Sequence, residues 1–339
     1  MRDWPATAAG CQLALAQPAH YPQVMAMDPL LLAAAAIVRG ELVGMPTETV
    51  YGLAANALDP LAVLRIFAAK GRPSFDPLIV HVADAQQAWD IGVPSPRARL
   101  LAAACWPGPL TLVLPRRAIV PDAVTSGLET VGIRCPAHPL AQALIRASGV
   151  PLAAPSANLF GRISPTTAAH VAEQLGTHCT IILDGGPCQI GIESTVLVPD
   201  PLPLILRPGG VSRERLADIL GEPVAIAARH VHATHLPLQA PGLLASHYAP
   251  RKLLALRTAD EPWPSDPRVG ILAFSHAPRS ALSETLSATG NLEEAAMRLF
   301  ACLRRLDASA ATTLMAELVP DSGLGLGIND RLRRAAGLG

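Results

Sequence analysis

Residues 45–57 read MPTETVYGLAANA, and this stretch separates two apolar runs of the chain. We expect a strand to end near Met45 and a helix to begin at Asp59, with a turn between them that carries hydroxyl groups and a carboxylate. The polar side chains of this turn are those of Thr47, Glu48, Thr49 and Tyr51. Ligands of open α/β sheets bind at the carboxyl ends of strands, so this turn is a candidate ligand site. The alternative is that its hydroxyls only make local turn and capping bonds.

Outward from this turn, helix starts and short strands alternate along the chain. A capping residue followed by proline marks four expected helix starts, at Asp28, Asp59, Ser95 and Ser164. Eight short apolar or β-branched runs predict strands, within residues 41–45, 77–82, 110–115, 130–135, 150–155, 180–186, 193–198 and 202–207. Some of these runs follow one another with no helix between them, as 110–115 and 130–135 do. The pattern therefore predicts an α/β fold whose sheet is mixed, with antiparallel pairs.

The length of 339 residues exceeds the usual size of one hydrophobic core, which favours two domains. We expect an N-terminal extension over residues 1–26, a first α/β domain over 27–220, a linker over 221–250 and a smaller α/β domain over 251–339. The linker is rich in histidine, proline and alanine. Its histidines at 230, 232 and 235 have no standard metal-site spacing.

Composition excludes several classes of protein. The chain has 27 basic and 27 acidic residues, so no overall field attracts it to nucleic acid or to an anionic membrane. Its longest apolar run is too short to cross a bilayer. The six cysteines lack zinc-site spacing, and we expect them to be reduced in a cytoplasmic protein. No Walker loop, GxGxxG fingerprint, GxSxG elbow, HExxH motif or kinase motif set occurs.

Polar residues near expected strand and helix ends are the candidates for chemistry. Lys70 and Arg72, with glycine between them, would suit a polyphosphate, although cations at a helix end are also common for dipole reasons. His81 closes a strand, where a packed core histidine is the alternative. Further candidates lie at the ends of expected elements. Ser156 and Asn158 follow a strand, Ser164 begins a helix, Ser194 starts a strand and Arg207 ends one.

Five ordered motifs resemble the YrdC-like family: PTETVYGL, KGRP with PLIVHV, PSAN with SPT, GGPCQIGIESTV, and LRPGG. The resemblance runs from about residue 30 to 211. The later segments APGLLASHYAPRK and GLGLGINDRLRRAA are similar to the two-domain threonylcarbamoyl-AMP synthases of that family. The resemblance implies a nucleotidyltransferase, with a YrdC-like catalytic domain and a Rossmann-like C-terminal domain. Its reaction would convert L-threonine, bicarbonate and ATP to threonylcarbamoyl-AMP and pyrophosphate, for threonylcarbamoyladenosine modification of tRNA that reads codons beginning with A.

The resemblance also implies roles for individual residues. The expected catalytic set is Lys70, Arg72, Ser156 and Asn158. The expected ATP contacts are Arg72, Asp76, Thr130, Ser156, Ser164, Arg207, His247 and Tyr248. The expected threonine contacts are Thr49, His81, Arg134, Ala154 and Ser194, with Arg134 on the carboxylate. Residues 240–250 of the linker would form a lid over the nucleotide, the alternative being a passive tether.

One departure from the family pattern concerns metal binding. Asp76 stands where the family usually has asparagine, so it would either bind the Mg²⁺ that accompanies ATP or turn outward. The expected partners are the three substrates and the transferase machinery that uses the product, with weak tRNA contact as an option and no membrane.

Two other functions fit the same fold. One is a non-catalytic factor that binds double-stranded RNA or the ribosome, which zero net charge and 4% aromatic residues disfavour. The other is carbamoyl transfer in hydrogenase maturation, which needs accessory regions that this chain lacks.

Overall fold

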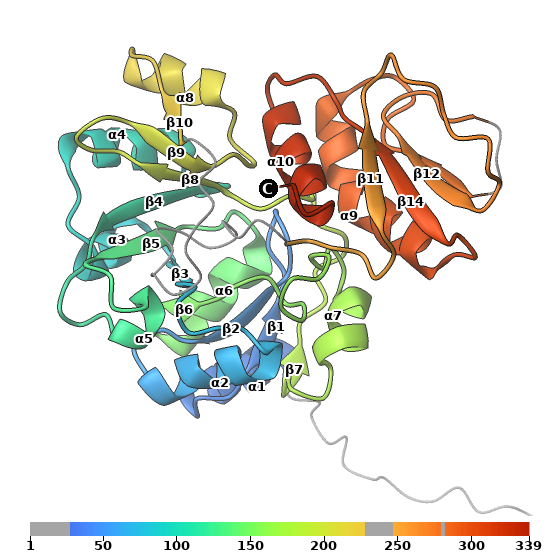
Figure 1. Ribbon diagram of the computed structural model, residues 1–339. Helices are drawn as coiled ribbons and strands as arrows, with labels where there is room; N and C mark the ends of the chain where they lie inside the picture. The colour runs from blue at the N-terminus through green and yellow to red at the C-terminus, as the bar shows by residue number, and fades with distance from the viewer. Residues whose placement is uncertain (1–27, 228–246, 279–281, 339) are drawn as a thin grey trace, which may run out of the picture.

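The computed structural model describes residues 28–227, 247–278 and 282–338, and these residues build two sheets with their helices (Figure 1). The expected extension over 1–26 lies outside the described residues, as do most of the linker and the histidines at 230, 232 and 235. The domain boundaries stay a prediction. In the described part of the chain, no helix is long and apolar enough to span a membrane.

The first sheet has ten strands in the order β10-β9-β8-β4-β5-β3-β6-β2-β1-β7 and is mixed, as expected. Its strands are β1 (Val43–Met45), β2 (Gly52–Asn56), β3 (Ile79–His81), β4 (Leu110–Pro115), β5 (Thr130–Arg134), β6 (Leu152–Ala153), β7 (Ile181–Ile182), β8 (Thr195–Val198), β9 (Leu204–Arg207) and β10 (Ala225–Ile226). The pairs β4–β5 and β8–β9 are antiparallel. The sequence predicts no helix between the strands of either pair. This is confirmed for β8–β9 and wrong for β4–β5, because the short helix α5 (Asp122–Thr125) lies between those two strands along the chain.

One expectation about residues 45–57 is wrong, because they do not form a single turn. The segment Gly52–Asn56 is strand β2, antiparallel to β1, with Met45 opposite Gly52. The sequence of this strand is GLAAN, which has no β-branched or aromatic residue, so pairing with β1 and β6 rather than propensity makes it a strand. The turn is therefore shorter than expected and ends at Tyr51.

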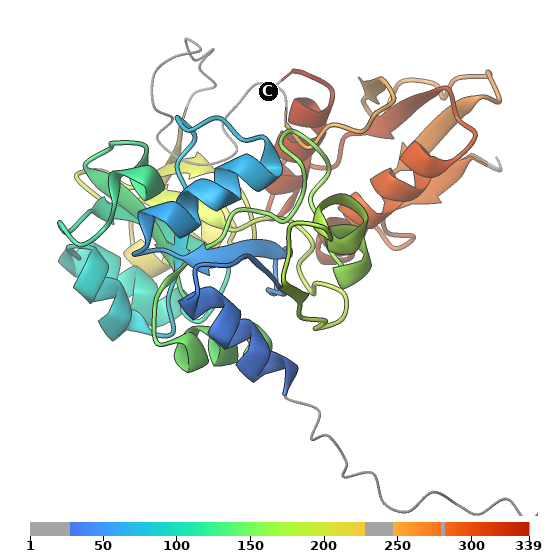
Figure 2. The same ribbon diagram turned by 90° about the horizontal axis from the view of Figure 1, so that it is seen from below.

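Eight helices accompany this sheet: α1 (Pro29–Val38), α2 (Pro60–Lys70), α3 (Ala85–Ile91), α4 (Pro96–Cys105), α5 (Asp122–Thr125), α6 (Pro139–Ser148), α7 (Ala168–Leu175) and α8 (Arg213–Leu220). Helices α1 and α6 lie together on one face of the sheet, and α2 lies on the other (Figure 2). Asp28, Asp59 and Ser95 cap their helices as expected. Ser164 does not: Thr167 caps α7.

The second sheet is parallel, with the order β11-β14-β12-β13. It contains β11 (Leu254–Arg257), β12 (Val269–Ala273), β13 (Ser283–Thr285) and β14 (Thr313–Glu317), with helices α9 (Leu292–Ala308) and α10 (Gly325–Ala335). This arrangement is the small α/β unit that the sequence predicts. Its core continues into the first unit, because Val50, Ile163 and Ile192 belong to the same buried cluster as Phe300 and Ile328. The turn after β1 is therefore fixed partly by the C-terminal unit.

Candidate active site

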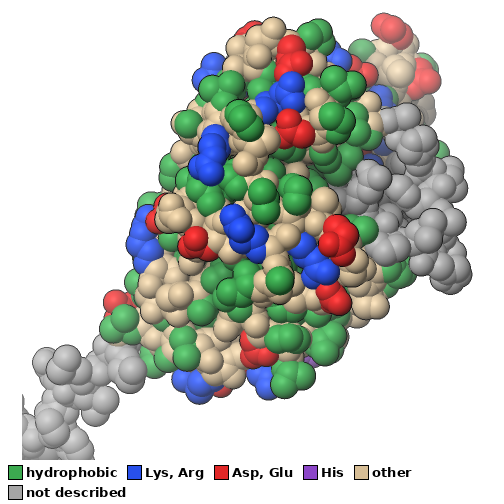
Figure 3. Space-filling view, turned by 90° about the vertical axis from the view of Figure 1, so that its left-hand side faces the viewer, with side chains coloured by type: hydrophobic (Ala, Val, Ile, Leu, Met, Phe, Trp, Pro, Cys, Tyr) green, Lys and Arg blue, Asp and Glu red, His purple; other side chains and the backbone are tan. Residues whose placement is uncertain are grey.

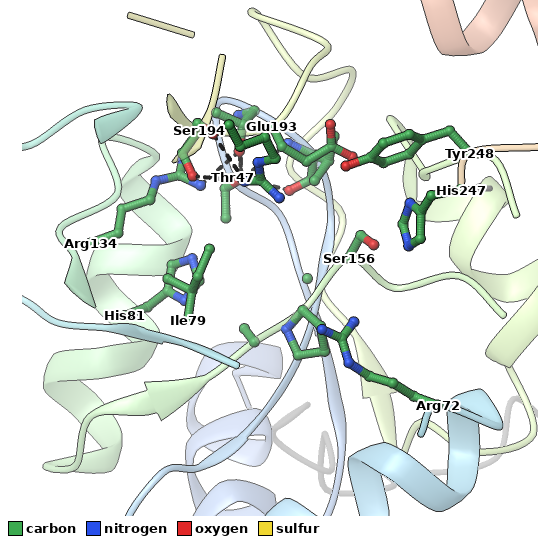
Figure 4. A pocket seen from close by; sticks show the side chains of 16 residues that line it. Thr47, Arg72, Ile79, His81, Arg134, Ser156, Glu193, Ser194, His247 and Tyr248 are labelled. Carbon is green, nitrogen blue, oxygen red and sulfur yellow. Dashed lines mark hydrogen bonds between the residues drawn. The ribbon is translucent and has the colours of Figure 1, made fainter. Parts of the chain in front are cut away.

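A pocket with about 530 Å³ of empty space lies where several strand ends of the first sheet meet residues 247 and 248 (Figure 4). Its lining contains ten of the residues that the family resemblance implies: Thr49, Arg72, His81, Arg134, Ala154, Ser156, Ser194, Arg207, His247 and Tyr248. These residues come from distant parts of the first domain and from the end of the linker.

Arg134 ends strand β5 and is already paired inside the protein. Its Nη2 lies 2.6 Å from Glu48 Oε1, and both side chains are 5% exposed. Its Nη1 donates to Thr49 Oγ1 at 2.8 Å, and its Nε donates to the Gly108 carbonyl at 3.3 Å. Glu48 also accepts a hydrogen bond from the Ala137 amide. The hydroxyl-rich turn after β1 therefore orients this arginine.

The same turn also satisfies its own backbone. Thr47 Oγ1 accepts from the Val50 amide at 3.2 Å and lies 2.9 Å from Thr49 Oγ1. Local turn bonding and a place in the pocket wall are thus both properties of this stretch.

His81 ends strand β3 directly beside Arg134 of β5. Burial, together with the nearby Arg134 guanidinium, lowers the pKa of His81 to about 3. The imidazole is therefore neutral at physiological pH. Its buried Nδ1 has no hydrogen-bond partner within the described protein, so one polar atom in the pocket wall is left for a ligand.

Arg72 follows helix α2 after Gly71, which takes the left-handed conformation with φ of 60°. Its Nε donates to the Asp76 carbonyl at 3.1 Å and its Nη2 donates to the Pro77 carbonyl at 3.0 Å. The Asp76 carboxylate lies 2.9 Å from Nη2 and its side chain is fully buried. The expectation that Asp76 turns outward is therefore wrong. Its carboxylate compensates Arg72 behind the pocket wall.

Lys70 lies beneath the pocket rather than in its lining. Its ammonium donates to the Ser156 carbonyl at 2.5 Å and to the Asn158 carbonyl. Burial, followed by the charge of Arg72, lowers the pKa of Lys70. Lys70 thus holds the loop that follows β6, and Ser156 of that loop lines the pocket.

Ser194, which precedes strand β8, and Arg207, which ends strand β9, are in direct contact. Ser194 Oγ lies 2.8 Å from Thr111 Oγ1, and Arg207 Nη2 donates to the Ser194 carbonyl at 2.9 Å. Arg207 is 4% exposed and still lines the pocket. The predicted nucleotide contact and the predicted threonine contact are thus in direct contact with each other.

His247 and Tyr248 belong to the described part of the expected lid, residues 247–250; its residues 240–246 lie outside the described chain. The His247 ring packs edge-on against Tyr248 at 4.1 Å between centroids, and Tyr248 stacks on Phe300 at 5.7 Å. The His247 amide donates to the Arg334 carbonyl. Burial and the charge of Arg72 lower the pKa of His247, so both rings enter the pocket uncharged.

Besides Lys70 and Asp76, three more of the predicted residues lie outside this lining. Asn158 donates from Nδ2 to the carbonyls of Leu159 and Arg162, and Ser164 Oγ donates to Glu193. Thr130, at the opposite end of β5 from Arg134, lines a separate hollow. The structure therefore does not place these three side chains in contact with a ligand in this pocket.

Sequence reasoning missed one carboxylate and one arginine of the site. Glu193 lines the pocket, and its Oε2 lies 2.9 Å from Nε of Arg331, which is on α10 and 0% exposed. The segment RLRRAA shows several arginines at the end of the chain but no signal that one of them is buried. Only the packing of α10 on the first unit reveals it.

Comparisons with known proteins decide the family. Residues 35–209 match the Sua5/YciO/YrdC family, described as Telomere recombination. Residues 211–337 match the family described as Threonylcarbamoyl-AMP synthase, C-terminal domain. The chain belongs to the two-domain threonylcarbamoyl-AMP synthase family. It is therefore an enzyme of nucleotidyltransferase type, and both the family and the fold class expected from its motifs are confirmed.

Several relatives of this synthase match nearly its whole length. The Bacillus subtilis threonylcarbamoyl-AMP synthase is 44% identical over 329 residues, which is 91% of this chain and 94% of the relative. The Pyrococcus abyssi synthase is 41% identical, over 90% of this chain and 93% of the relative. The crystal structure of P. abyssi Sua5 complexed with L-threonine matches with a TM-score of 0.83 and 41% identity, over 91% of this chain and 94% of that one.

Proposed function

We propose that this synthase makes threonylcarbamoyl-AMP from L-threonine, bicarbonate and ATP, with release of pyrophosphate. The observation that carries the proposal is that one pocket joins two groups of side chains (Figure 4). Arg134 and His81 lie at one side, and His247, Tyr248 and Arg72 lie at the other. The threonine complex of the P. abyssi protein supports an amino-acid site in this fold.

The Arg134 side of the pocket suits a small zwitterion. A guanidinium has five N–H groups, and the three contacts of Arg134 leave one N–H on each terminal nitrogen for a carboxylate. The neutral His81 ring offers its unpartnered Nδ1 without repelling an amine. We therefore assign the amino acid to this end.

The opposite side of the pocket suits a nucleoside triphosphate. The Arg72 guanidinium is held rigid through Nε and Nη2 by two backbone carbonyls and the Asp76 carboxylate, which leaves the N–H groups of Nη1 for phosphate oxygens. Arg207 adds a second buried positive charge in the same lining. The uncharged rings of His247 and Tyr248 would cover the nucleoside part.

Within this geometry the reaction needs positioning, protection and charge neutralisation. The threonine amine reacts with bicarbonate and loses water, which forms a carbamate that water would otherwise destroy. A carbamate oxygen then attacks the α-phosphorus of ATP, the bond to the β-phosphate oxygen breaks, and pyrophosphate leaves with that electron pair. Arg72 and Arg207 would neutralise the developing charge.

We propose that the Mg²⁺ needed with ATP is held by the phosphates, because the described acidic side chains around this pocket do not fit a metal site. Three of them are paired with arginine: Glu48 with Arg134, Asp76 with Arg72, and Glu193 with Arg331. Asp76 in particular does not line the pocket. A bound Mg²⁺ would supply further neutralisation of phosphate charge.

The product would serve threonylcarbamoyladenosine modification of tRNA in the cytoplasm, through a separate transferase machinery. On the face of the described residues shown in Figure 3, Lys and Arg side chains lie among Asp and Glu rather than in one continuous basic stripe. That pattern does not favour tight RNA binding through this face, which agrees with a soluble adenylate intermediate passed to another enzyme.

The test is pyrophosphate release measured with threonine, bicarbonate and ATP omitted in turn. We expect release only when all three are present. We expect serine to compete with threonine, because one methyl group is worth only about 10- to 200-fold in discrimination. Full pyrophosphate release without threonine or without bicarbonate would contradict the proposed reaction.

A further inference from the structure

Arg331 is a fully buried arginine that the C-terminal unit inserts against the pocket wall of the first unit. Its Nε lies 2.9 Å from Glu193 Oε2. Its Nη1 donates to the Pro208 carbonyl and lies 3.2 Å from Asp330 Oδ2. Its guanidinium lies 5.4 Å from the centre of the Tyr248 ring. One side chain thus touches three segments that build the pocket.

Glu193 connects this arginine to residues that line the pocket. Its Oε1 accepts from Ser164 Oγ at 2.5 Å, and its carbonyl accepts from the Gly210 amide at 3.0 Å. The next residue, Ser194, is bonded to Arg207. A shift of the Glu193 side chain would therefore move both Ser194 and the turn that follows β9.

The backbone packing around this contact is tight. A Cβ atom at Gly327 would lie 3.3 Å from Gly209 Cα and 3.0 Å from Ile192 Cδ1. A Cβ atom at Gly209 would lie 2.3 Å from the Glu193 carbonyl oxygen. Helix α10 is therefore seated directly on the turn after β9, which leaves little freedom for the Arg331 guanidinium.

We propose that Arg331 is a positioning residue for the synthase reaction, which holds the Glu193 carboxylate and the Pro208 carbonyl in one fork and thereby fixes Ser194 and Arg207 in the pocket wall. The C-terminal unit is then needed for the geometry of the active site. This inference rests on the proposed function, because pyrophosphate release is its readout.

The charge state of Glu193 should affect the pH dependence of activity, and a variant that had only lost stability would not show this change. Burial would raise the pKa of Glu193, but the charges of Arg331 and then Arg207 hold it below its usual value. The other charged or titratable groups around it are Tyr248, Cys188 and Asp330. Without Arg331, burial dominates and the pKa of Glu193 rises, so the carboxylate takes up a proton at higher pH.

The experiment compares Arg331→Met with Arg333→Met, a control on the same helix whose side chain pairs with Asp321 instead. We expect Arg331→Met to lose roughly 100-fold in kcat/KM for threonine-dependent pyrophosphate release, as misplaced catalytic groups do. We also expect the acid limb of its pH profile to move to higher pH, because the pKa of the buried Glu193 rises without the Arg331 charge. Arg333→Met should match the wild type in both respects.

Two further variants keep the inference testable if Arg331→Met folds poorly, which circular dichroism and thermal unfolding would reveal. Arg331→Lys retains the charge but cannot form the fork, so we expect an unshifted acid limb with about tenfold slower turnover. In Arg331→Met/Glu193→Gln, which has no carboxylate to titrate at 193, the acid limb should return to its wild-type position.

Three results would overturn the inference: an unshifted acid limb in folded Arg331→Met, wild-type turnover in Arg331→Lys, or equal activity of Arg331→Met and Arg333→Met. Failure of the proposed function looks different. In that case the wild-type enzyme itself would release pyrophosphate without threonine, or release none at all.

Discussion

Glu48 and Arg134 form a buried ion pair in which the carboxylate and the guanidinium are 2.6 Å apart and each side chain is 5% exposed. The carboxylate comes from the turn after β1 and the guanidinium from the end of β5. The charge of Arg134 is thus compensated before any substrate arrives. A threonine carboxylate would share this arginine with Glu48 rather than meet a free cation.

Replacing Glu48 by glutamine should therefore destabilise the protein. It should also increase the stabilisation that bound threonine gives. Breaking one half of a buried pair leaves an uncompensated charge, which costs about 3 kcal/mol of unfolding free energy. The threonine carboxylate would then replace the missing partner. We expect a lower melting temperature for Glu48→Gln and a larger upward shift on adding threonine than in the wild type.

The matched control for that variant is Glu41→Gln, which removes the carboxylate of a surface pair with Arg39. It should change neither the melting temperature nor the threonine response measurably. Equal threonine-induced shifts in Glu48→Gln and the wild type would show that the amino acid does not use Arg134.

The sequence predicts which residues line the pocket better than it predicts which groups pair with the charged ones. The family resemblance implies His81, Arg134 and Ser194, and all three line the pocket. His81 and Ser194 lie in the ordered motifs of that family, whereas Arg134 lies outside them, at the end of the strand TVGIR. The partners of these charges could not be assigned. Glu48 pairs with a residue far along the chain, and Arg331 reaches Glu193 only through the packing of two units.

Replacing Arg72 by lysine tests the second end of the pocket. Lysine keeps the charge but cannot make the two bonds from Nε and Nη2 to the Asp76 and Pro77 carbonyls. We expect the KM for ATP to rise about tenfold or more, with little change in the KM for threonine. Steady-state pyrophosphate release at varied ATP measures this. Arg39→Lys, at an exposed pair, is the control, and an unchanged KM for ATP in Arg72→Lys would place the phosphates elsewhere.

The neutral His81 makes a prediction about acid stability. Its pKa is about 3 in the folded protein and near the ordinary 6.5 when unfolded. Between these values the unfolded chain binds more protons, so folded-state stability falls as pH drops below 6.5, by at most about 1.4 kcal/mol per pH unit from this group. His81→Gln lacks this contribution, so its urea midpoint should fall less steeply from pH 6.5 to 4.

The exposed His178 provides the comparison for that experiment. His178→Gln should leave the pH dependence of the urea midpoint as it is in the wild type. If His81→Gln and the wild type lose stability in parallel over this range, His81 is not held neutral by the fold.

The sequence also predicts most of the fold, and its failures have physical causes. The strands at 110–115 and 195–198 are rich in β-branched and leucine residues, and their pattern is enough to find them. Strand β2 has the sequence GLAAN and is a strand because its neighbours pair with it. Helix α7 begins later than expected, because the expected cap Ser164 is bonded to Glu193 and Thr167 caps the helix instead.

The contact between the two units can be tested at Gly191. This residue has φ of +79°, and a Cβ atom there would lie 2.4 Å from Met297 Cα on helix α9. Gly186 has a similar φ of +76° with nothing within 4 Å of its Cβ position, so Gly186→Ala measures the backbone strain alone, about 1–2 kcal/mol. Gly191→Ala adds a collision with backbone that cannot move freely. We expect its unfolding free energy to fall by roughly 2 kcal/mol more than that of Gly186→Ala.

Because α9 and α10 share one core with Val50 and Ile192, pyrophosphate release should also fall in Gly191→Ala. Equal stability and equal activity of the two alanine variants would contradict a close contact between helix α9 and the backbone at Gly191, which precedes Glu193.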